Sequence, residues 1–215
     1  MTLAYLSTAE AAEKAGVSVR TIQRMIDREE LAAERVGNQL LISIKELDDV
    51  FERMAQVPKI GRAAPQLKLD YWTAFGELLD WQGWPYKHKP RSEQWMAFSV
   101  ANCRVAAHIR LNQGLIGVDL TLGSKAKQYY YHLKKQEESI EAEIRDAVLK
   151  NNPRVEWEGL EWHERPNNAE SWVLIRKESD VTNRLWWSAQ HYWLSERLRA
   201  FHETFKRKLD EIQKV

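Results

Sequence analysis

The segment "VSVRTIQRMIDREEL", residues 17–31, decides how the N-terminal part of the chain folds. In a helix, its polar and apolar side chains separate onto opposite sides. The apolar side carries Ile22, Met25 and Ile26, and the polar side carries Arg20, Gln23 and Arg24. That polar side is either a surface that contacts the edges of DNA bases or the solvated face of a small helical core.

The preceding residues indicate another helix directly before this one. Ser7-Thr8-Ala9-Glu10 has the pattern of a capping box, in which a serine hydroxyl and a glutamate carboxylate bind free backbone N–H groups. This helix should run from about Thr8 to Ala15 and end at Gly16, because glycine readily adopts the left-handed cap. Ser18 can then cap the next helix. Two short helices joined so tightly predict a helix-turn-helix.

A hairpin and a third helix are expected next. The segment "LAAERVGNQLLIS", residues 31–43, has two alternating apolar runs around Gly37-Asn38, a pair that favours a tight turn. This hairpin would be a wing. Ser43 and Glu46 repeat the capping-box pattern and open a helix through about Met54. The apolar face of that helix would carry Leu47, Val50, Phe51 and Met54.

Residues 4–54 resemble the excisionase-type branch of the MerR-like winged helix-turn-helix domains. The motifs that carry the resemblance are "AGVS", "RTIQRMI", "RVGNQLLI" and "SIKELDDV". One departure is Glu30, where the family usually has glycine after the second helix. The resemblance implies that the second helix enters the major groove and that the wing follows the DNA backbone. The residues it implies at DNA are Ser18, Arg20, Thr21 and Arg24 on the helix, and Arg35, Asn38 and Gln39 on the wing.

The chemistry of these residue types agrees with base recognition. Arg20, Gln23 and Arg24 share one face in the N-terminal half of the helix. Arginine can donate two hydrogen bonds to guanine and glutamine can pair with adenine, each discriminating by about 1–3 kcal/mol. Ser18 and Thr21, at the helix start, suit phosphate contacts instead.

Charge argues against binding by one isolated copy. The chain has 32 basic and 31 acidic residues, a net charge of +1, so it has no long-range positive field. Residues 1–60 hold eight basic and ten acidic residues, 8 − 10 = −2. Because phosphate neutralisation supplies most DNA affinity, we expect a homodimer that places two reading helices on adjacent half-sites.

The composition changes partway along the chain. All ten tryptophans lie at or beyond Trp72, and "QVPKIGRAAPQLK" between the two regimes contains Pro58, Gly61 and Pro65. We therefore expect a DNA-binding domain over residues 1–57, a linker over 58–66 and a second domain over 67–215. The chain shows neither a membrane span nor a signal peptide and has one cysteine, so a cytoplasmic protein is expected.

The second domain reads as α+β. A helix is expected over 69–81, followed by strands in "WMAFSV", "VAAHIRL" and "LIGVDLTL", the last two joined by a hairpin loop and therefore antiparallel. A long helix over about 125–150 and two further strands should follow. The closing helix, about 182–213, carries a regular apolar stripe suited to packing on the sheet or on a second copy: Leu194, Leu198, Phe201, Phe205, Leu209 and Ile212.

Residues 69–210 resemble an uncharacterised bacterial family, the domain of unknown function 4268. The motifs are "YWTAFGELL", "GVDLTL", "KKQEESIEAEI" and "WVLIRKESDVTN". Because the family has no assigned chemistry, the resemblance implies a domain boundary and little about activity. Some relatives carry nuclease-like N-terminal regions, an association with DNA metabolism or defence.

Catalytic and metal-binding patterns are weak. A restriction-type nuclease needs Asp/Glu-x-Lys, and no such triplet occurs in the sequence. Asp119 is expected to be solvated or salt-bridged, and the six histidines are too scattered to share a metal. We therefore expect no enzyme activity, no metal and no cofactor.

The tryptophans have two interpretations. Trp81, Trp157, Trp172, Trp186 and Trp193 are expected in the core, although tryptophans can also form a stacking platform or a pocket. The exception is "WQGWPYKHKPR", predicted as a loop in which aromatic and cationic groups could hold phosphate or an acidic ligand. Its candidate residues are Trp84, Tyr86, Lys87, Lys89 and Arg91.

Taken together, these patterns predict a sequence-specific protein that binds double-stranded DNA and regulates transcription. Its second domain would dimerise, sense a small effector or bind a protein partner. Two alternatives stay open: a DNA-targeting accessory subunit of a phage-defence or recombination system, and a nuclease of unfamiliar design.

Overall fold

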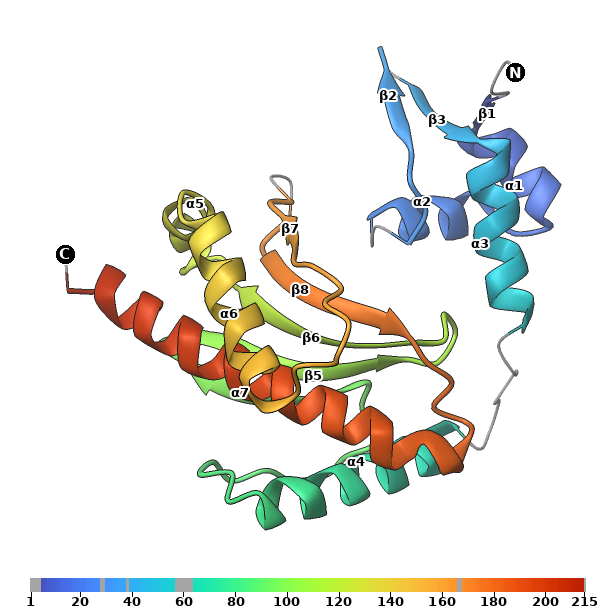
Figure 1. The fold of residues 1–215 in the computed structure, drawn as a ribbon. Helices are drawn as coiled ribbons and strands as arrows, with labels where there is room; N and C mark the ends of the chain where they lie inside the picture. Colours follow the sequence, from blue (N-terminus) through green and yellow to red (C-terminus); the bar gives the residue numbers. More distant parts are fainter. Residues whose placement is uncertain (1–4, 28–29, 38, 57–63, 166–167, 215) are drawn as a thin grey trace. The chain divides into compact units, whose positions relative to one another are not determined.

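The computed structural model describes residues 5–27, 30–37, 39–56, 64–165 and 168–214, with residues 53–56 as backbone only. The chain divides into two compact units, Met1–Pro58 and Lys59–Val215. Figure 1 shows the elements of each unit.

The first unit begins with the predicted capped helix. In α1 (Thr8–Ala15), the Ser7 hydroxyl accepts a hydrogen bond from the Glu10 amide at 3.3 Å, and the Glu10 carboxylate accepts one from the Ser7 amide at 2.8 Å. Gly16 ends the helix in the left-handed conformation, with φ 66°. The predicted capping box and glycine cap are both confirmed.

The second helix, α2 (Val19–Asp27), packs its apolar side into a small core. Ile22 is fully buried and Met25 nearly so. Helices α1 and α2 contact one another across the short turn after Gly16, as the helix-turn-helix prediction requires. The core they share with the rest of the unit is Ala11, Ala12, Ile22, Met25, Leu31, Ile42, Leu47 and Val50.

A small antiparallel sheet completes this unit. Strands β2 (Glu34–Val36) and β3 (Gln39–Ser43) form the predicted hairpin, and Gly37 adopts the positive φ of 59° that its turn requires. A further strand, β1 (Tyr5–Ser7), pairs with the other edge of β3. Its three residues are too few for the sequence pattern to predict a strand.

Helix α3 (Ile44–Gln56) follows β3 directly. The Ser43 hydroxyl accepts a hydrogen bond from the Glu46 amide at 3.1 Å, as expected of a helix cap. Leu47 and Val50 are buried and Phe51 packs against the same core. The side chain of Met54, predicted on this face, lies outside the described residues.

The second unit is built on a five-stranded antiparallel sheet in the order β4-β5-β6-β8-β7. The strands β4 (Trp95–Val100), β5 (Cys103–Arg110) and β6 (Leu115–Leu122) form a meander close to the predicted strands. Strand β8 (Ser171–Glu178) pairs with β6, and the short β7 (Glu161–His163) pairs with β8. The predicted α+β fold is confirmed.

Helix α7 (Trp187–Ile212) lies across one face of this sheet and contacts β4, β5 and β6 (Figure 1). Its apolar stripe meets the alternate residues of the strands that point to the same side. The stripe is buried as predicted, apart from the partly buried Ile212: Leu194, Leu198, Phe201, Phe205 and Leu209.

The prediction of one long helix over residues 125–150 is wrong. The structure has two helices, α5 (Lys127–Lys134) and α6 (Glu137–Asn151), with a break at Lys135 and Gln136. Helix α5 contacts α7 and also the strands β6 and β8, whereas α6 makes its main contacts with α7. The break lets α5 contact the sheet while α6 packs along α7, an arrangement that helical periodicity along the sequence does not reveal.

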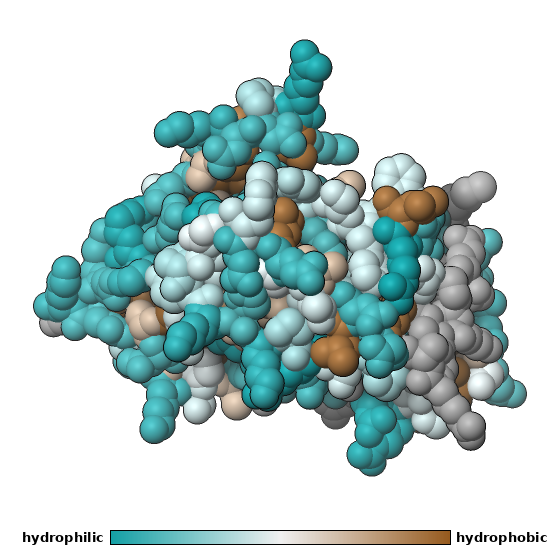
Figure 2. Space-filling view, turned by 90° about the horizontal axis from the view of Figure 1, so that it is seen from below, coloured by the Kyte–Doolittle hydropathy of each residue, from teal (hydrophilic) through white to brown (hydrophobic). Residues whose placement is uncertain are grey.

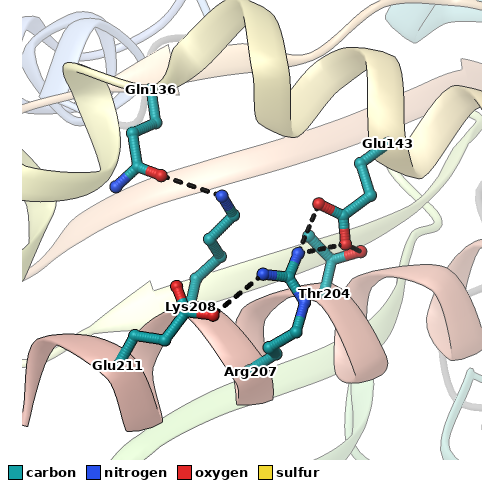
Figure 3. A network of polar contacts seen from close by, with 6 residues as sticks. All are labelled: Gln136, Glu143, Thr204, Arg207, Lys208 and Glu211. Atoms are coloured by element: carbon teal, nitrogen blue, oxygen red, sulfur yellow. Dashed lines mark hydrogen bonds and ion pairs between the residues drawn. The ribbon is translucent and has the colours of Figure 1, made fainter.

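Helix α6 is also joined to α7 by the polar network in Figure 3. Arg207 of α7 binds Glu143 of α6 and Glu211 of its own helix, and the Thr204 hydroxyl donates to Glu143 at 3.2 Å. The Lys208 ammonium donates to Gln136 at 2.8 Å, at the break between α5 and α6. Since Arg207 is half exposed, its ion pairs contribute little stability, and the apolar stripe dominates.

The boundary of the second unit differs from the predicted linker over 58–66. Helix α4 (Ala64–Trp81) already includes residues 64–66, while residues 57–63 lie outside the described part of the chain. Pro65 does not interrupt this helix because proline fits the first helical turn, where its missing N–H would have no partner.

Two of the five tryptophans predicted in the core are exposed. Trp193 is buried and Trp157 and Trp172 are half-buried, but Trp81 is 76% exposed and Trp186 is 61% exposed. Trp81 is the last residue of α4, and Trp186 lies in a 3-10 helix before α7. At such ends the helical period no longer determines which side a residue faces.

The face in Figure 2 shows small groups of hydrophobic residues among hydrophilic ones, as on an ordinary protein surface. Among the described residues, no helix combines the length and the hydropathy needed to cross a membrane.

Candidate nucleic-acid interface

The exposed side of α2 carries the three polar residues that the sequence singles out. Arg20, Gln23 and Arg24 are all exposed, while Ile22 and Met25 on the opposite side are 0% and 4% exposed. The helical period, anchored by these two buried residues, thus fixes which side chains face solvent. The structure brings the three predicted base-reading residues together on one open surface.

The guanidinium groups on this surface are unengaged. Across the described part of the chain, neither Arg20 nor Arg24 makes a hydrogen bond or an ion pair. By contrast, Lys14 on α1 is held by Asp48 of α3 at 2.8 Å. A guanidinium with all its donors in water can bind a guanine edge or a phosphate without first breaking an internal contact.

Ser18 and Thr21 lie at the start of the same helix and cap it. The Ser18 hydroxyl accepts a hydrogen bond from the Thr21 amide at 3.1 Å, and the two hydroxyl oxygens are 2.9 Å apart. The predicted cap at Ser18 is therefore present. To contact a phosphate, these hydroxyls would donate a hydrogen that the cap does not use.

The hairpin provides the other predicted contacts. Arg35 on β2 and Gln39 on β3 are exposed, and Val36 beside the turn is 57% exposed. Figure 1 shows the hairpin extending away from the helices of its own unit. Asn38, the third predicted residue of this group, lies outside the described residues.

Most acidic residues of this unit lie on α1 and α3, although Glu34 is exposed beside Arg35 on β2. Helix α3 alone carries four of them, and α1 carries two, Glu10 and Glu13. On α2 the first acidic residue is Asp27, the last residue of the helix. A unit of net negative charge can therefore still present a locally positive surface to DNA. The four on α3 are Glu46, Asp48, Asp49 and Glu52.

The loop predicted to hold an acidic ligand is arranged differently from the expectation. Trp84 is only 8% exposed and packs against Phe98 and His202, with ring centroids 5.1 Å and 5.5 Å away. Gly83, at φ 68°, turns the chain so that Trp84 folds back onto the core. The prediction that this aromatic stays accessible is wrong. Tyr86 is 37% exposed, and the loop cations Lys87, Lys89 and Arg91 remain exposed.

Three buried titratable residues of the second unit behave as core groups. Burial lowers the pKa of His191 to about 4, although a backbone hydrogen bond at Tyr71 raises it, and burial raises the pKa of Cys103 to about 11. His202 is likewise buried, and burial lowers its pKa. A protonated thiol is a poor nucleophile, so Cys103 is not an activated one. Among the described residues, no three His, Cys, Asp or Glu side chains are grouped to hold a metal ion.

Sequence reasoning missed one group of polar side chains, on the sheet of the second unit. Asp119, expected to be solvated or salt-bridged, pairs with His108 at 3.1 Å and accepts a hydrogen bond from Thr121 at 2.7 Å. His108 and Asp119 are eleven residues apart in the sequence, so no short motif links them. The period-two pattern of β5 and β6 would have found the pair, since it places both residues on the face opposite the apolar one.

Two family models match the chain. A helix-turn-helix domain matches residues 5–55, and the domain of unknown function DUF4268 matches residues 67–209, about two thirds of the 215 residues. No curated protein and no solved structure matches. The two matches correspond to the two resemblances seen in the sequence.

Proposed function

The chain belongs to the DUF4268 family and carries an N-terminal helix-turn-helix DNA-binding domain, and we propose that it is a transcriptional regulator. In this role it binds double-stranded DNA at specific sequences. In this proposal α2 enters the major groove and the β2–β3 hairpin acts as a wing along the DNA backbone.

The observation that carries the proposal is the pair of unengaged arginines on α2. Arg20 and Arg24 lie one helical turn apart with Gln23 between them, on the side opposite the buried Ile22 and Met25. Their donors can reach the edges of neighbouring base pairs. The capped start of the helix at Ser18 lies close to the phosphates in this docking mode.

We also propose that the protein acts as a homodimer. With a net charge of −2 over residues 1–60, one copy neutralises few phosphates and binds weakly. Two copies on adjacent half-sites would double the contacts without a more basic domain. Sedimentation at micromolar concentration tests this. A monomer both alone and on its DNA site would overturn it.

The direct test is to recover genomic fragments bound by the purified full chain and sequence them. The proposal expects a recurrent site near promoters, and a change in transcription of the adjacent genes when the chain is deleted. If the chain binds no duplex at low ionic strength, sequence-specific recognition is excluded. If it binds but transcription does not change, its role in regulation is excluded while DNA binding stands.

Two single substitutions distinguish base contacts, which give sequence preference, from phosphate contacts, which do not. Arg24→Ala should lower affinity for the recovered site by about 1–3 kcal/mol and reduce its preference over unrelated duplexes. Arg35→Ala should weaken all duplexes alike and reduce the slope of log affinity against log salt by about 1. Lys45→Ala, a change of an exposed lysine on α3, is the matched control and should do neither. Equal losses of both kinds in the two arginine variants would contradict these roles.

A further inference from the structure

The sheet of the second unit has two faces of different chemistry. The helix-covered face is apolar, with residues such as Val105, Val118 and Phe98 in the core. The register places the alternate residues of each strand on the opposite face, which we call the outer face. Its polar and aromatic residues are Trp95 and Ser99 on β4, Arg104, His108 and Arg110 on β5, Asp119 and Thr121 on β6, Trp172, Arg176 and Glu178 on β8, and Glu161 and His163 on β7.

A chain of hydrogen bonds links four of these residues across β5 and β6. The Arg104 guanidinium donates to the Thr121 hydroxyl at 3.1 Å, and this hydroxyl donates to Asp119 at 2.7 Å. The other oxygen of Asp119 lies 3.1 Å from Nδ1 of His108. The chain therefore holds Arg104 in a defined position at the outer face.

The imidazole of His108 extends from this chain over Gly117. A Cβ atom added at Gly117 would lie 2.5 Å from Nε2 of His108, so a side chain there would displace the ring. Gly117 pairs with Arg176 of β8, whose guanidinium binds the Glu161 carboxylate through two hydrogen bonds of 2.8 Å. Polar side chains thus run across β5, β6, β8 and β7.

These polar groups are costly for the fold. Burial acts to raise the pKa of Asp119, yet the hydrogen bond and charge of His108, with Thr121 and Arg104, lower it overall, so the carboxylate is ionised. Apolar residues of similar volume are often as stable as a buried ion pair or more so. The sheet does not need such a chain to fold, and the direct consequence of the chain is that Arg104 is held in a fixed position.

Two accessible residues show what the ligand would be. Trp95 is 43% exposed, and the exposed Arg104 lies beside it, with its guanidinium carbon 5.8 Å from the ring centroid. Ala97 and Ser99 of the same edge strand are also exposed, so the surface continues openly along β4. An open surface that combines an aromatic face with a positioned cation suits an extended polymer of bases and phosphates better than a small molecule, which needs a concave site.

We propose that the β4 edge of the outer face binds single-stranded nucleic acid, with a base stacked on Trp95 and the adjacent phosphate held by Arg104. The β5–β6 hydrogen-bond chain fixes the cation. The polynucleotide follows the exposed residues of β4, because His108, Thr121 and Leu174 farther along the outer face are buried. Sheets that present an aromatic residue for stacking are a surface that single-strand-binding domains use. This site does not depend on duplex recognition by α2.

The test uses the full chain and fluorescein-labelled oligo(dT) and oligo(U) about 12 nucleotides long, within the ~4–16 nucleotides of known single-strand sites. Fluorescence anisotropy at low salt measures affinity, and the comparison of the two oligomers distinguishes DNA from RNA. Trp95→Ala should weaken binding by about 5- to 150-fold, the equivalent of ~1–3 kcal/mol for one stacked base. Arg104→Gln should weaken it and lower the salt slope by about 0.7.

Matched controls separate this site from other surfaces. Trp81→Ala removes another exposed tryptophan and Arg145→Ala another half-exposed arginine, and both should leave single-strand binding unchanged. A chain with Arg20→Ala and Arg24→Ala should lose duplex recognition but keep oligo(dT) or oligo(U) binding. The proposal is overturned if the wild-type chain binds neither oligomer, if Trp95→Ala and Arg104→Gln bind normally, or if the α2 variant removes the binding.

Discussion

Arg24 on α2 and Arg197 on α7 are the same residue type in opposite settings. Arg24 is exposed and has no ionic partner among the described residues, whereas Arg197 is fully buried. The Arg197 guanidinium donates to the Glu158 carboxylate at 2.8 Å and to the Glu156 carbonyl at 3.1 Å, and it lies 4.2 Å from the ring centroid of Trp193.

The difference shows how each unit uses its charges. An exposed arginine keeps its hydration, adds little to stability and leaves its donors free for a ligand. A buried arginine must be compensated by fixed partners, and here those partners hold the segment before β7 against α7. The DNA contacts proposed for the first unit thus rest on unpaired cations, whereas Arg197 of the second unit is paired and structural.

The strongest way to break this comparison is Arg197→Ala. Removing a buried, paired guanidinium should lower the free energy of unfolding of the second unit by about 3–5 kcal/mol, because Glu158 loses its ionic partner and the Glu156 carbonyl loses its donor. Urea denaturation followed by tryptophan fluorescence measures this effect, since all the tryptophans lie in that unit. A loss below about 1 kcal/mol would mean that Arg197 does not hold the segment in place.

A second test uses the titration of the buried His191. Its folded pKa of about 4 lies below the ordinary 6.5, so between these values the unfolded chain binds a proton that the folded chain does not. The free energy of unfolding should therefore fall as the pH drops from about 6.5 to 4, by up to about 1.4 kcal/mol per pH unit. His191→Gln should flatten this dependence in urea titrations. An unchanged slope would show that His191 is not the group responsible.

Substitutions on the α2 surface should lower DNA affinity and leave folding stability almost unchanged. Arg20→Ala should weaken binding to the recognised duplex by about 1–3 kcal/mol, or about 5- to 150-fold, while the free energy of unfolding changes by less than about 0.5 kcal/mol. Anisotropy with labelled duplex measures the first quantity and thermal denaturation the second. If stability falls as much as affinity, the residue belongs to the fold and the contrast with Arg197 disappears.

The smallest expected effect concerns Ser7, which caps the start of α1 in the first unit. Ser7→Ala removes the hydroxyl that accepts from the Glu10 amide and should destabilise this unit by about 1 kcal/mol. Ser7→Thr keeps an oxygen at the same place and serves as the control. Circular dichroism at 222 nm during thermal unfolding of both variants provides the comparison. Equal melting of Ser7→Ala and wild type would assign the helix start to its apolar contacts instead.

Much of the first unit could be predicted because its signals are local. A capping box involves residues three positions apart, a turn needs a glycine at one place, and helical periodicity separates Arg20 and Arg24 from Ile22. Each of these is decided within a few residues. The short strand β1 was missed since it exists only by pairing with β3.

The second unit was less predictable where contacts are distant in the sequence. Alternation predicted β5 and β6, and the stripe predicted the buried side of α7. Nothing local shows that Lys135 and Gln136 separate two helices with different partners. The burial of Trp84 depends on Phe98 and His202, which no nearby residue reveals.

The sequence by itself determined the caps, the helical faces and the alternating strands, because hydrogen bonds and side-chain periods within a few residues suffice for them. Only the tertiary structure decided which polar groups meet. It brings Arg104, His108, Asp119 and Thr121 together on one face, and it encloses Arg197 with Glu158. The physical reason is that strand register and helix packing are set by the whole core.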